Sequence, residues 1–316
     1  MIHWGINALN HGSSLAVVKD GKLRSFSTFG NDILPSEVIR VCLEYEGTPD
    51  QVYWYERPWV KKTRQLYAGQ YKTAADMSVL PSRWLKDNGL GYAPVKYTPH
   101  HGSHAAAGYY TSPFKHAAVV VLDAIGEWEC ATIWEGIDGR LTKQWSRSYP
   151  HSLGLFYSAF TKLIGLTPIK DEYLLGKMAE QGDYKRYYDM VNSYFDSYPE
   201  LMLNYNFHRG VEHWEYAITN LQDQCDIAAA VQKVFEEQVV EVMKIAKHIT
   251  GSDNLVYMGG CAMNSQANRL IEPMWKGIWS LPNPGDPSSA LGSILYHTKE
   301  RISWEGDQAK HIAIKL

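Results

Sequence analysis

Two stretches of this chain follow the same pattern, and they decide the expected fold. Residues 4–23 read WGINALNHGSSLAVVKDGKL, and residues 119–141 read VVVLDAIGEWECATIWEGIDGRL. Each contains a strand, a polar turn, a second strand and an Asp-Gly pair, a dipeptide that favours a type I′ hairpin turn. The two Asp-Gly pairs are separated by the same interval as Gly5 and Asp123. We therefore predict an internal duplication, in which two α/β lobes each open with a hairpin that faces a shared cleft.

Composition and charge argue against several classes of protein. The chain has 316 residues, of which 45% are apolar and 21% charged, values typical of a packed globular protein with room for two lobes. Its net charge of -3 gives no general attraction to nucleic acid or to an anionic membrane. We expect no membrane span and no signal peptide, because no long apolar run occurs and the N-terminus begins directly as a strand. The four cysteines show no CxxC spacing, so we expect a reducing compartment, the cytoplasm, and no cysteine-based zinc site.

The boundary between the lobes is expected near residues 111–114, which gives a first lobe over 1–114 and a second over 115–316. Residues 183–220 are rich in Tyr, Asp and Asn and indicate an insertion in the second lobe, whereas residues 59–90 show no clear periodicity. Apolar side chains recur every three or four positions over 222–249, which predicts the clearest helix of the chain. Other helices are predicted over 35–46 and 289–297, and strands over 52–55 and 254–258.

A pair of histidines is the sharpest local signal. His100 and His104 lie four residues apart in the run PHHGSHAAA, residues 99–107. The alanines favour a helix, and Pro99 suits its first turn. On a helix both imidazoles share one face, close enough to bind a single ion. An isolated pair at this spacing more often caps a helix or faces water, so a metal site needs further ligands.

Two aspartates are the candidates for those ligands. Asp123 follows four apolar β-formers, at the carboxyl end of a buried strand, where ligands collect in α/β sheets; it is also compatible with a simple turn. Asp286 stands before a proline at the start of a helix, a position that suits an N-cap as well as a metal ligand. Sequence spacing does not separate these alternatives.

Two glycine-containing turns could approach a phosphate. Gly259-Gly260 ends a predicted strand and precedes a predicted helix, and Gly126-Glu127 follows Asp123. Glycine lets a phosphate or ribose come close to the backbone, and the start of a helix offers free N–H groups. Either turn alone is equally compatible with a tight change of chain direction.

Longer motifs occur in one order along nearly the whole chain, and together they resemble a known family, the O-carbamoyltransferases that act on nodulation factors and on aminoglycoside or cephem antibiotics. The motifs of the first half are HGSS at 11–14, LPSEVIRVCL at 34–43, YERP at 55–58, HHGSHA at 100–105 and SPF at 112–114. Those of the second half are LDAIGE at 122–127, SLGLFYSAFT at 152–161, DIAAAVQ at 226–232, GGCAMN at 259–264, PGD at 284–286 and ALGS at 290–293.

The resemblance implies an α/β fold of the actin-like ATPase class (acetate kinase–hsp70–actin), duplicated in two lobes. It implies a divalent ion, Fe(II) before Zn or Mn, held by His100, His104, Asp123 and Asp286. It also implies that ATP is used and that a carbamoyl-adenylate intermediate is bound by Gly126, Glu127, Gly259, Gly260 and Asn264. The reaction would transfer the carbamoyl group to an acceptor hydroxyl or amine.

Two further residues are candidates for catalysis. His11 lies in the first turn, which is expected to face the cleft, and is the candidate general base for the acceptor; a plain turn residue is the alternative. Lys177 is carried over from the family's Lys-x-Met-Gly-Leu-Ala segment, although here the lysine has moved within the segment LLGKMA, residues 174–179.

The chain departs from the family in two other places. Residues 25–31 lack the basic run that usually follows the first hairpin. Full-length relatives also carry a C-terminal domain that makes carbamoyl-adenylate from carbamoyl phosphate and ATP. We therefore expect a separate adenylate-forming protein as a partner, besides a small-molecule or nucleotide acceptor.

Two other functions are compatible with the same motifs. One is a threonylcarbamoyl transferase acting on tRNA adenosine, which shares the fold and the histidine pair. The mild negative charge does not favour a tRNA-binding protein. The other is a non-catalytic, nucleotide-sensing actin-like module, against which the intact set of metal-ligand candidates argues.

Overall fold

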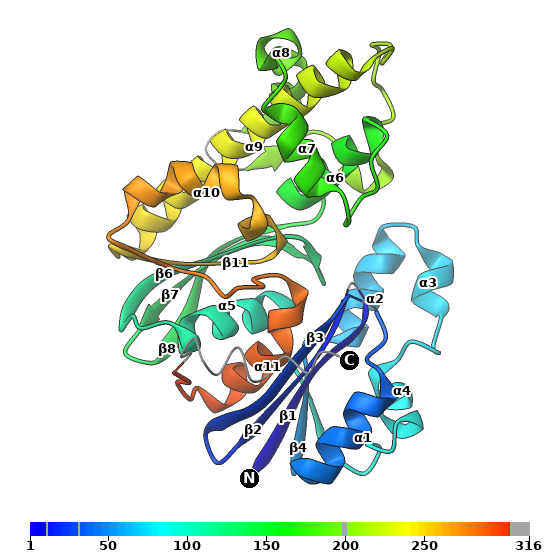
Figure 1. The fold of residues 1–316 in the computed structure, drawn as a ribbon, viewed down its shortest axis with the longest axis vertical. Helices are drawn as coiled ribbons and strands as arrows, with labels where there is room; N and C mark the ends of the chain where they lie inside the picture. The colour runs from blue at the N-terminus through cyan, green and yellow to red at the C-terminus, as the bar shows by residue number, and fades with distance from the viewer. Residues whose placement is uncertain (11, 31, 198–200, 304–316) are drawn as a thin grey trace.

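The computed structural model describes residues 1–10, 12–30, 32–197 and 201–303, which contain two five-stranded sheets of the same topology (Figure 1). In the first sheet, β1 (Ile2–Asn10) is antiparallel to β2 (Gly12–Lys19) and parallel to β4 (Gln51–Trp54). In the second, β6 (His116–Gly126) is antiparallel to β7 (Glu129–Ile137) and parallel to β11 (Asn254–Met258). The outer strands are β3 (Lys22–Phe29), β5 (Val95–Tyr97), β8 (Arg140–Ser148) and β12 (Gly277–Trp279). The orders β3-β2-β1-β4-β5 and β8-β7-β6-β11-β12 correspond strand for strand, which confirms the predicted duplication.

Both Asp-Gly pairs form the predicted hairpin turns. The φ angles are 50° at Asp20 and 74° at Gly21, and 46° at Asp138 and 84° at Gly139. Positive φ at both central residues is the conformation of a type I′ turn, whose twist matches that of the flanking strands. The turns therefore fix the register of the hairpin in each lobe.

Helices cover the outer face of the first sheet. α1 (Ser36–Tyr45) agrees with the helix predicted over 35–46, and its Val38 and Ile39 pack in a core that also contains Trp4 and Trp54. Residues 59–90, for which no periodicity is apparent, contain α2 (Pro58–Tyr67), α3 (Tyr71–Ala75) and α4 (Pro81–Asp87). α2 and α4 both begin at a proline, whose fixed φ suits the first helical position.

Helices α5 (His100–Thr111) and α11 (Ser289–Thr298) lie between the two sheets and pack against each other (Figure 1). Their backbones approach closely, because a Cβ on Gly292 would lie 1.8 Å from the carbonyl oxygen of Ser103. α5 packs on β6 and β11 of the second sheet, whereas α11 packs on β1 and β2 of the first. Each half of the chain thus contributes a helix to the sheet of the other half, and the division near residue 114 stays a proposal.

The outer layer of the second lobe is built around α9 (Leu221–Thr250), which confirms the helix predicted over 222–249. The Asn220 side chain caps its N-terminus, and Gly251, with φ of 61°, ends it in the left-handed conformation. α9 packs against α6 (Leu153–Leu163), α7 (Glu172–Ala179) and α10 (Ser265–Ile271). The remaining short elements are η1 (Tyr184–Arg186), α8 (Tyr188–Asn192), β9 (Phe195–Ser197), β10 (Met202–Leu203), η2 (Phe207–Arg209), η3 (Gly260–Met263), η4 (Glu272–Met274) and η5 (Asp286–Ser288). Across the described ranges, no helix is both long enough and apolar enough to cross a membrane.

Candidate metal and nucleotide site

The histidine pair lies at the start of α5, buried between the two sheets. His100 and His104 are 1% and 0% exposed, and their Nε2 atoms face each other at 3.1 Å. The helix brings the two rings to one side because four residues make slightly more than one turn. Both histidines are buried, so they do not face water. They do not cap the helix either, because its N-cap is Pro99.

Asp123 and Asp286 complete a cluster around these rings. The Oδ2 atom of Asp123, on β6, lies 3.0 Å from His100 Nε2 and 3.7 Å from His104 Nε2. The Oδ1 atom of Asp286 lies 3.3 Å from both Nε2 atoms. One nitrogen or oxygen atom from each of the four residues lies within 4.8 Å of the others. Asp286 is the first residue of η5, whose N-cap is Gly285. Among the described residues its buried Oδ1 atom accepts no hydrogen bond, and it faces the two histidines instead.

Neighbouring groups orient the cluster. The Oδ1 atom of Asp123 accepts the backbone N–H of Gly260 at 3.2 Å. His104 Nδ1 lies 3.4 Å from the Ser289 hydroxyl. Outer contacts of this kind fix the ring orientation and tautomer of a metal-binding histidine.

Charge and burial act together on the ionisation of these groups. Burial by itself would lower the pKa of His100, but the carboxylates of Asp286 and Asp123 raise it well above its ordinary value. Burial would likewise lower the pKa of His104, and the same two carboxylates raise it. Conversely, burial would raise the pKa values of Asp123 and Asp286, and the two histidines lower both. The two aspartates are therefore stabilised as carboxylates. The positive charge beside them can be a proton on each imidazole or a bound metal cation.

The donor set fits a borderline divalent cation. Two imidazole nitrogens and two carboxylate oxygens suit iron, zinc or manganese, and the two negative charges of the aspartates balance an ion of charge 2+. The four atoms converge from α5, β6 and η5 rather than dispersing into solvent. Neither thiol close to Asp123, that of Cys130 or Cys261, is part of this set. Burial raises the pKa of both, so these thiols stay neutral.

Two of the glycines singled out in the sequence lie against this cluster, and a third lies against Leu122, the residue before Asp123. A Cβ on Gly126 would fall 2.2 Å from His100 Cδ2, and one on Gly260 would fall 3.1 Å from Asp123 Oδ1. Gly259 has φ of 92°, and a Cβ there would lie 2.2 Å from the carbonyl oxygen of Leu122. Each therefore permits a close approach that a larger residue would obstruct, and their contact with a nucleotide stays a proposal.

Asn264 connects the glycine turn to a pocket between α9 and α10. Its amide pairs reciprocally with that of Gln232: Gln232 Nε2 donates to Asn264 Oδ1 at 3.1 Å, and Asn264 Nδ2 donates to Gln232 Oε1 at 3.0 Å. Asn264 Oδ1 also caps α10 by accepting the N–H of Ala267. Gln232 in turn donates to Glu236 at 2.8 Å, so a chain of hydrogen bonds runs from the end of the glycine turn into the pocket.

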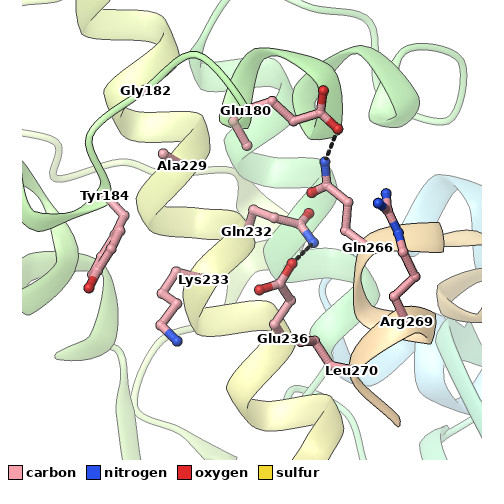
Figure 2. Close-up of a pocket in the computed structure, with 11 residues that line it drawn as sticks. Glu180, Gly182, Tyr184, Ala229, Gln232, Lys233, Glu236, Gln266, Arg269 and Leu270 are labelled. Atoms are coloured by element: carbon pink, nitrogen blue, oxygen red, sulfur yellow. Dashed lines mark hydrogen bonds between the residues drawn. The ribbon is translucent and has the colours of Figure 1, made fainter. Parts of the chain in front are cut away.

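The pocket has a volume of about 480 Å³, and its lining combines charged and amide side chains with apolar ones such as Leu270. Figure 2 shows Gln232 and Glu236 of α9 joined by a hydrogen bond, with Gln266 and Arg269 on the neighbouring α10. Gln266 donates to Glu180 at 2.9 Å, and burial raises the pKa of Glu236. This volume lies within the range of small-molecule sites. The lining offers hydrogen-bond donors and acceptors, and it contains both positively and negatively charged side chains.

Most of this chain matches the model of a known protein family. Residues 58–295 match the family model described as "Carbamoyltransferase N-terminus", a match that includes the two histidines, both aspartates and the glycine turns. The chain belongs to this carbamoyltransferase family.

Individual relatives of the carbamoyltransferase family agree with this assignment. The chain is 31% identical to the uncharacterized protein sll1178 of Synechocystis sp., over 92% of this chain and 56% of that protein. It is 24% identical to the nodulation protein NolNO of Sinorhizobium fredii, over 93% of this chain and 47% of that protein. The chain thus spans about half the length of these curated relatives.

Solved structures place the family domain in the actin-like ATPase class. Full-length HypF, in a phosphate- and nucleotide-bound form, is similar over 94% of this chain and 55% of HypF, with a TM-score of 0.50 and 14% identity. At that identity the likeness concerns the fold alone. It confirms the fold class expected from the motifs.

The sequence also singles out Glu127, Lys177 and His11. Glu127 is 4% exposed, and its carboxylate accepts the backbone N–H of Arg57 at 2.6 Å and its Nε–H at 3.0 Å. Lys177 is exposed on α7, with its ammonium over the ring of Tyr173. His11 lies outside the described residues. Roles for Glu127 in nucleotide binding and for His11 and Lys177 in catalysis stay predictions.

Sequence reasoning missed the pocket and the contact between the lobes. The apolar stripe of α9 predicts a core face, but the polar residues between, Gln232 and Glu236, give no local sign that they line a pocket. In the sequence, Arg57 is recognisable only as part of the YERP motif. A pairing across the lobes, such as that of Arg57 with Glu127, becomes visible only when the two hairpins are placed in space.

Proposed function

We propose that this chain transfers a carbamoyl group from carbamoyl-adenylate to an acceptor hydroxyl or amine, at a metal held by His100, His104, Asp123 and Asp286. The observation that carries the proposal is the convergence of these four ligands beside the Gly260 turn. Membership of the carbamoyltransferase family supports the type of group transferred. The four cysteines, all free, support the expected cytoplasmic location.

The protein's own part in the reaction is to hold and align. A divalent ion, Fe(II) by preference, would act as a Lewis acid toward the carbamoyl carbonyl or a phosphate oxygen. The four residues would keep that position fixed because His100 and His104 lie on α5, Asp123 on β6 and Asp286 at the start of η5. The acceptor oxygen or nitrogen attacks the carbamoyl carbon, the bond to the AMP phosphate oxygen breaks, and the acceptor proton passes to a base. His11 is our candidate for that base.

The nucleoside part of the donor would lie in the pocket between α9 and α10. Its phosphate would then point along the hydrogen-bond chain toward Gly259 and Gly260, and its carbamoyl group toward Asp123. Arg269 and Lys233 supply positive charge at the pocket, and Glu236 supplies an acceptor for ribose hydroxyls. The phosphate- and nucleotide-bound form of HypF supports a nucleotide site in this fold.

The test supplies the chain with synthetic carbamoyl-adenylate and a panel of sugar, nucleoside and aminoglycoside acceptors, after reconstitution with Fe(II). We expect AMP release that rises when an acceptor is present, and an acceptor mass increased by one carbamoyl group. Threonylcarbamoyl-adenylate with tRNA is the competing donor and acceptor pair. AMP release that no acceptor accelerates, or preference for the tRNA pair, would contradict the proposal. Nucleotide binding without transfer would favour the non-catalytic module.

A further inference from the structure

One buried side-chain amide of the first sheet stands out among the described residues. Asn7, on β1, is 0% exposed, and within the described ranges neither its Nδ2 nor its Oδ1 atom has a hydrogen-bond partner. Buried side-chain amides in folded proteins nearly always have partners, so each exception calls for an explanation. The amides of Gln232 and Asn264, which satisfy each other, show the arrangement that is usual.

The strand register places Asn7 on the side of the sheet that carries Asp286. Asn7 is paired with Ser14 of β2, so both side chains leave the sheet on the same face. The Ser14 hydroxyl donates to the carbonyl of Pro287 at 2.7 Å, and Pro287 directly follows Asp286. Two positions earlier on β1, a Cβ on Gly5 would fall 1.8 Å from the carbonyl oxygen of Ala290. This face of β1 is thus in direct contact with η5 and the start of α11.

The neighbouring strand leads from Asn7 to the histidines. Trp54 is the parallel partner of Ile6, and the N–H of Tyr55 donates to the carbonyl of Ile6 at 3.2 Å. The ring of Tyr55 in turn packs edge-on against His100, with 5.5 Å between ring centroids. Asn7 therefore lies at the end of the first hairpin, between the η5 turn that bears Asp286 and the strand end that contacts His100.

The chemistry of an amide defines what it can recognise. Its N–H groups donate and its carbonyl oxygen accepts, side by side and in one plane. A carbamoyl group has the same pair in complementary order, an acceptor oxygen and a donor NH₂ on one carbon, so the two can form a pair of reciprocal hydrogen bonds. An acetyl group offers the acceptor only, and a carboxylate or phosphate offers acceptors only. An amide is also neutral, so it leaves the charge balance of Asp123 and Asp286 with a divalent ion undisturbed.

We propose that Asn7 is the residue that selects the carbamoyl group, donating from Nδ2 to its carbonyl oxygen and accepting its NH₂ at Oδ1. This assignment rests on the proposed carbamoyl transfer and goes beyond it, because it names the residue that sets the specificity for the transferred group. A site that hydrogen-bonds a substrate polar group rejects an analogue lacking that group strongly, since its own buried atoms are then left unpaired.

The test compares carbamoyl-adenylate with acetyl-adenylate, which share the leaving group, for the wild-type chain and for Asn7→Leu and Asn7→Asp. We expect the wild type to prefer carbamoyl-adenylate in kcat/KM by roughly 100-fold or more. Asn7→Leu, of similar size but without polar atoms, should lose most of that ratio while its AMP affinity and metal content stay unchanged. Asn7→Asp, which only accepts, should lose it in part. Ser14→Ala is the matched control on the same face, and it should change both donors equally.

A binding measurement separates failure of this proposal from failure of the proposed function. The probes are hydrolysis-resistant sulfamoyl analogues of carbamoyl-adenylate and acetyl-adenylate, titrated calorimetrically. If no acceptor is carbamoylated but the wild type binds the carbamoyl analogue selectively and Asn7→Leu does not, the assignment of Asn7 stands and the transfer is wrong. If transfer occurs and Asn7→Leu keeps the full carbamoyl preference, Asn7 meets only water and the assignment is wrong. Equal binding of both analogues by the wild type, or binding of neither, overturns it without recourse to any variant.

Discussion

Asp123 accepts a hydrogen bond from the backbone N–H of Gly260 at 3.2 Å, across 137 positions of sequence. The same carboxylate presents its other oxygen to His100 at 3.0 Å. One side chain therefore connects the glycine turn, where a phosphate is proposed to bind, to the cluster that it forms with His100, His104 and Asp286. A phosphate at the glycine turn and a metal ion at the cluster should affect each other's affinity, because both depend on the orientation of the Asp123 carboxylate.

The metal assignment predicts that Asp286→Asn loses metal. Asn preserves the size of the side chain, and the cap of η5 is not at risk, because the N-cap residue is Gly285 and not Asp286. We expect metal affinity to fall by more than the roughly 10–100-fold that follows loss of an outer contact. His104→Ala should have the same effect. The measurement is metal content by mass spectrometry after anaerobic purification, with titration of Fe(II), Zn and Mn.

Asp253→Asn is the control for this change. Asp253 is an exposed aspartate that pairs with Lys276 at 2.6 Å, outside the cluster. Wild-type metal content in Asp253→Asn together with depleted metal in Asp286→Asn is the expected outcome. Full occupancy in Asp286→Asn or His104→Ala would remove these residues from the ligand set.

Gly260→Ala is predicted to weaken nucleotide binding and metal binding together. The added Cβ would lie 3.1 Å from Asp123 Oδ1, closer than most contacts of this kind, so the carboxylate must shift. Parallel titrations with an ATP analogue and with Fe(II) measure both effects. Gly30→Ala is the control, since a Cβ there meets nothing within 4 Å. If Gly260→Ala lowers neither affinity, the glycines serve only to turn the chain.

Arg269→Ala is predicted to lower AMP and ATP affinity about tenfold, the loss of roughly one charged hydrogen bond, and to leave metal binding intact. Arg269 lines the pocket from α10, opposite Glu236 of α9 (Figure 2). Arg40→Ala serves as control because Arg40 pairs with Glu37 on the exposed face of α1. Calorimetric titration of the three proteins gives the comparison. Unchanged affinity in Arg269→Ala would place the nucleoside elsewhere.

Arg57→Ala is predicted to destabilise the protein by about 2 kcal/mol, between the small value of an exposed ion pair and the cost of breaking a buried one. Glu127 is buried, whereas the Arg57 side chain is 43% exposed. Urea unfolding of Arg57→Ala, Glu127→Gln and the double variant forms a double-mutant cycle. The double variant should be less destabilised than the sum of the singles, because no unpaired buried carboxylate remains. Additive effects would mean that the pair contributes nothing across the lobes.

The chain alone, given ATP and carbamoyl phosphate, is predicted to release little pyrophosphate. A phosphate dianion requires several positively charged donors, and residues 25–31, where a basic run is expected, contain no Lys or Arg. Addition of an adenylate-forming protein, or of synthetic carbamoyl-adenylate, should allow transfer of the carbamoyl group to the acceptor. Pyrophosphate release is followed with and without that protein. Rapid release by the chain alone would show that both half-reactions occur on it.

Features that depend on nearby residues could be read from the sequence. The histidine pair follows from a helical period of four positions, the hairpin turns from two Asp-Gly pairs, and α9 from the spacing of its apolar side chains. Each is determined within a few residues, because backbone geometry and side-chain periodicity act over short distances. The duplicated fold was predictable for the same reason, since both hairpins carry the same local signals.

Whether Asp286 caps a helix or faces the histidines was decided by the tertiary structure alone. The local sequence suits both roles, and only the packing of α11 against α5 brings its carboxylate to within 3.3 Å of both imidazoles. The same holds for Arg57 with Glu127 and for the polar residues of α9 that line the pocket. These contacts join segments distant in the chain, so their geometry is set by how the two sheets and the helices between them pack, which no local pattern encodes.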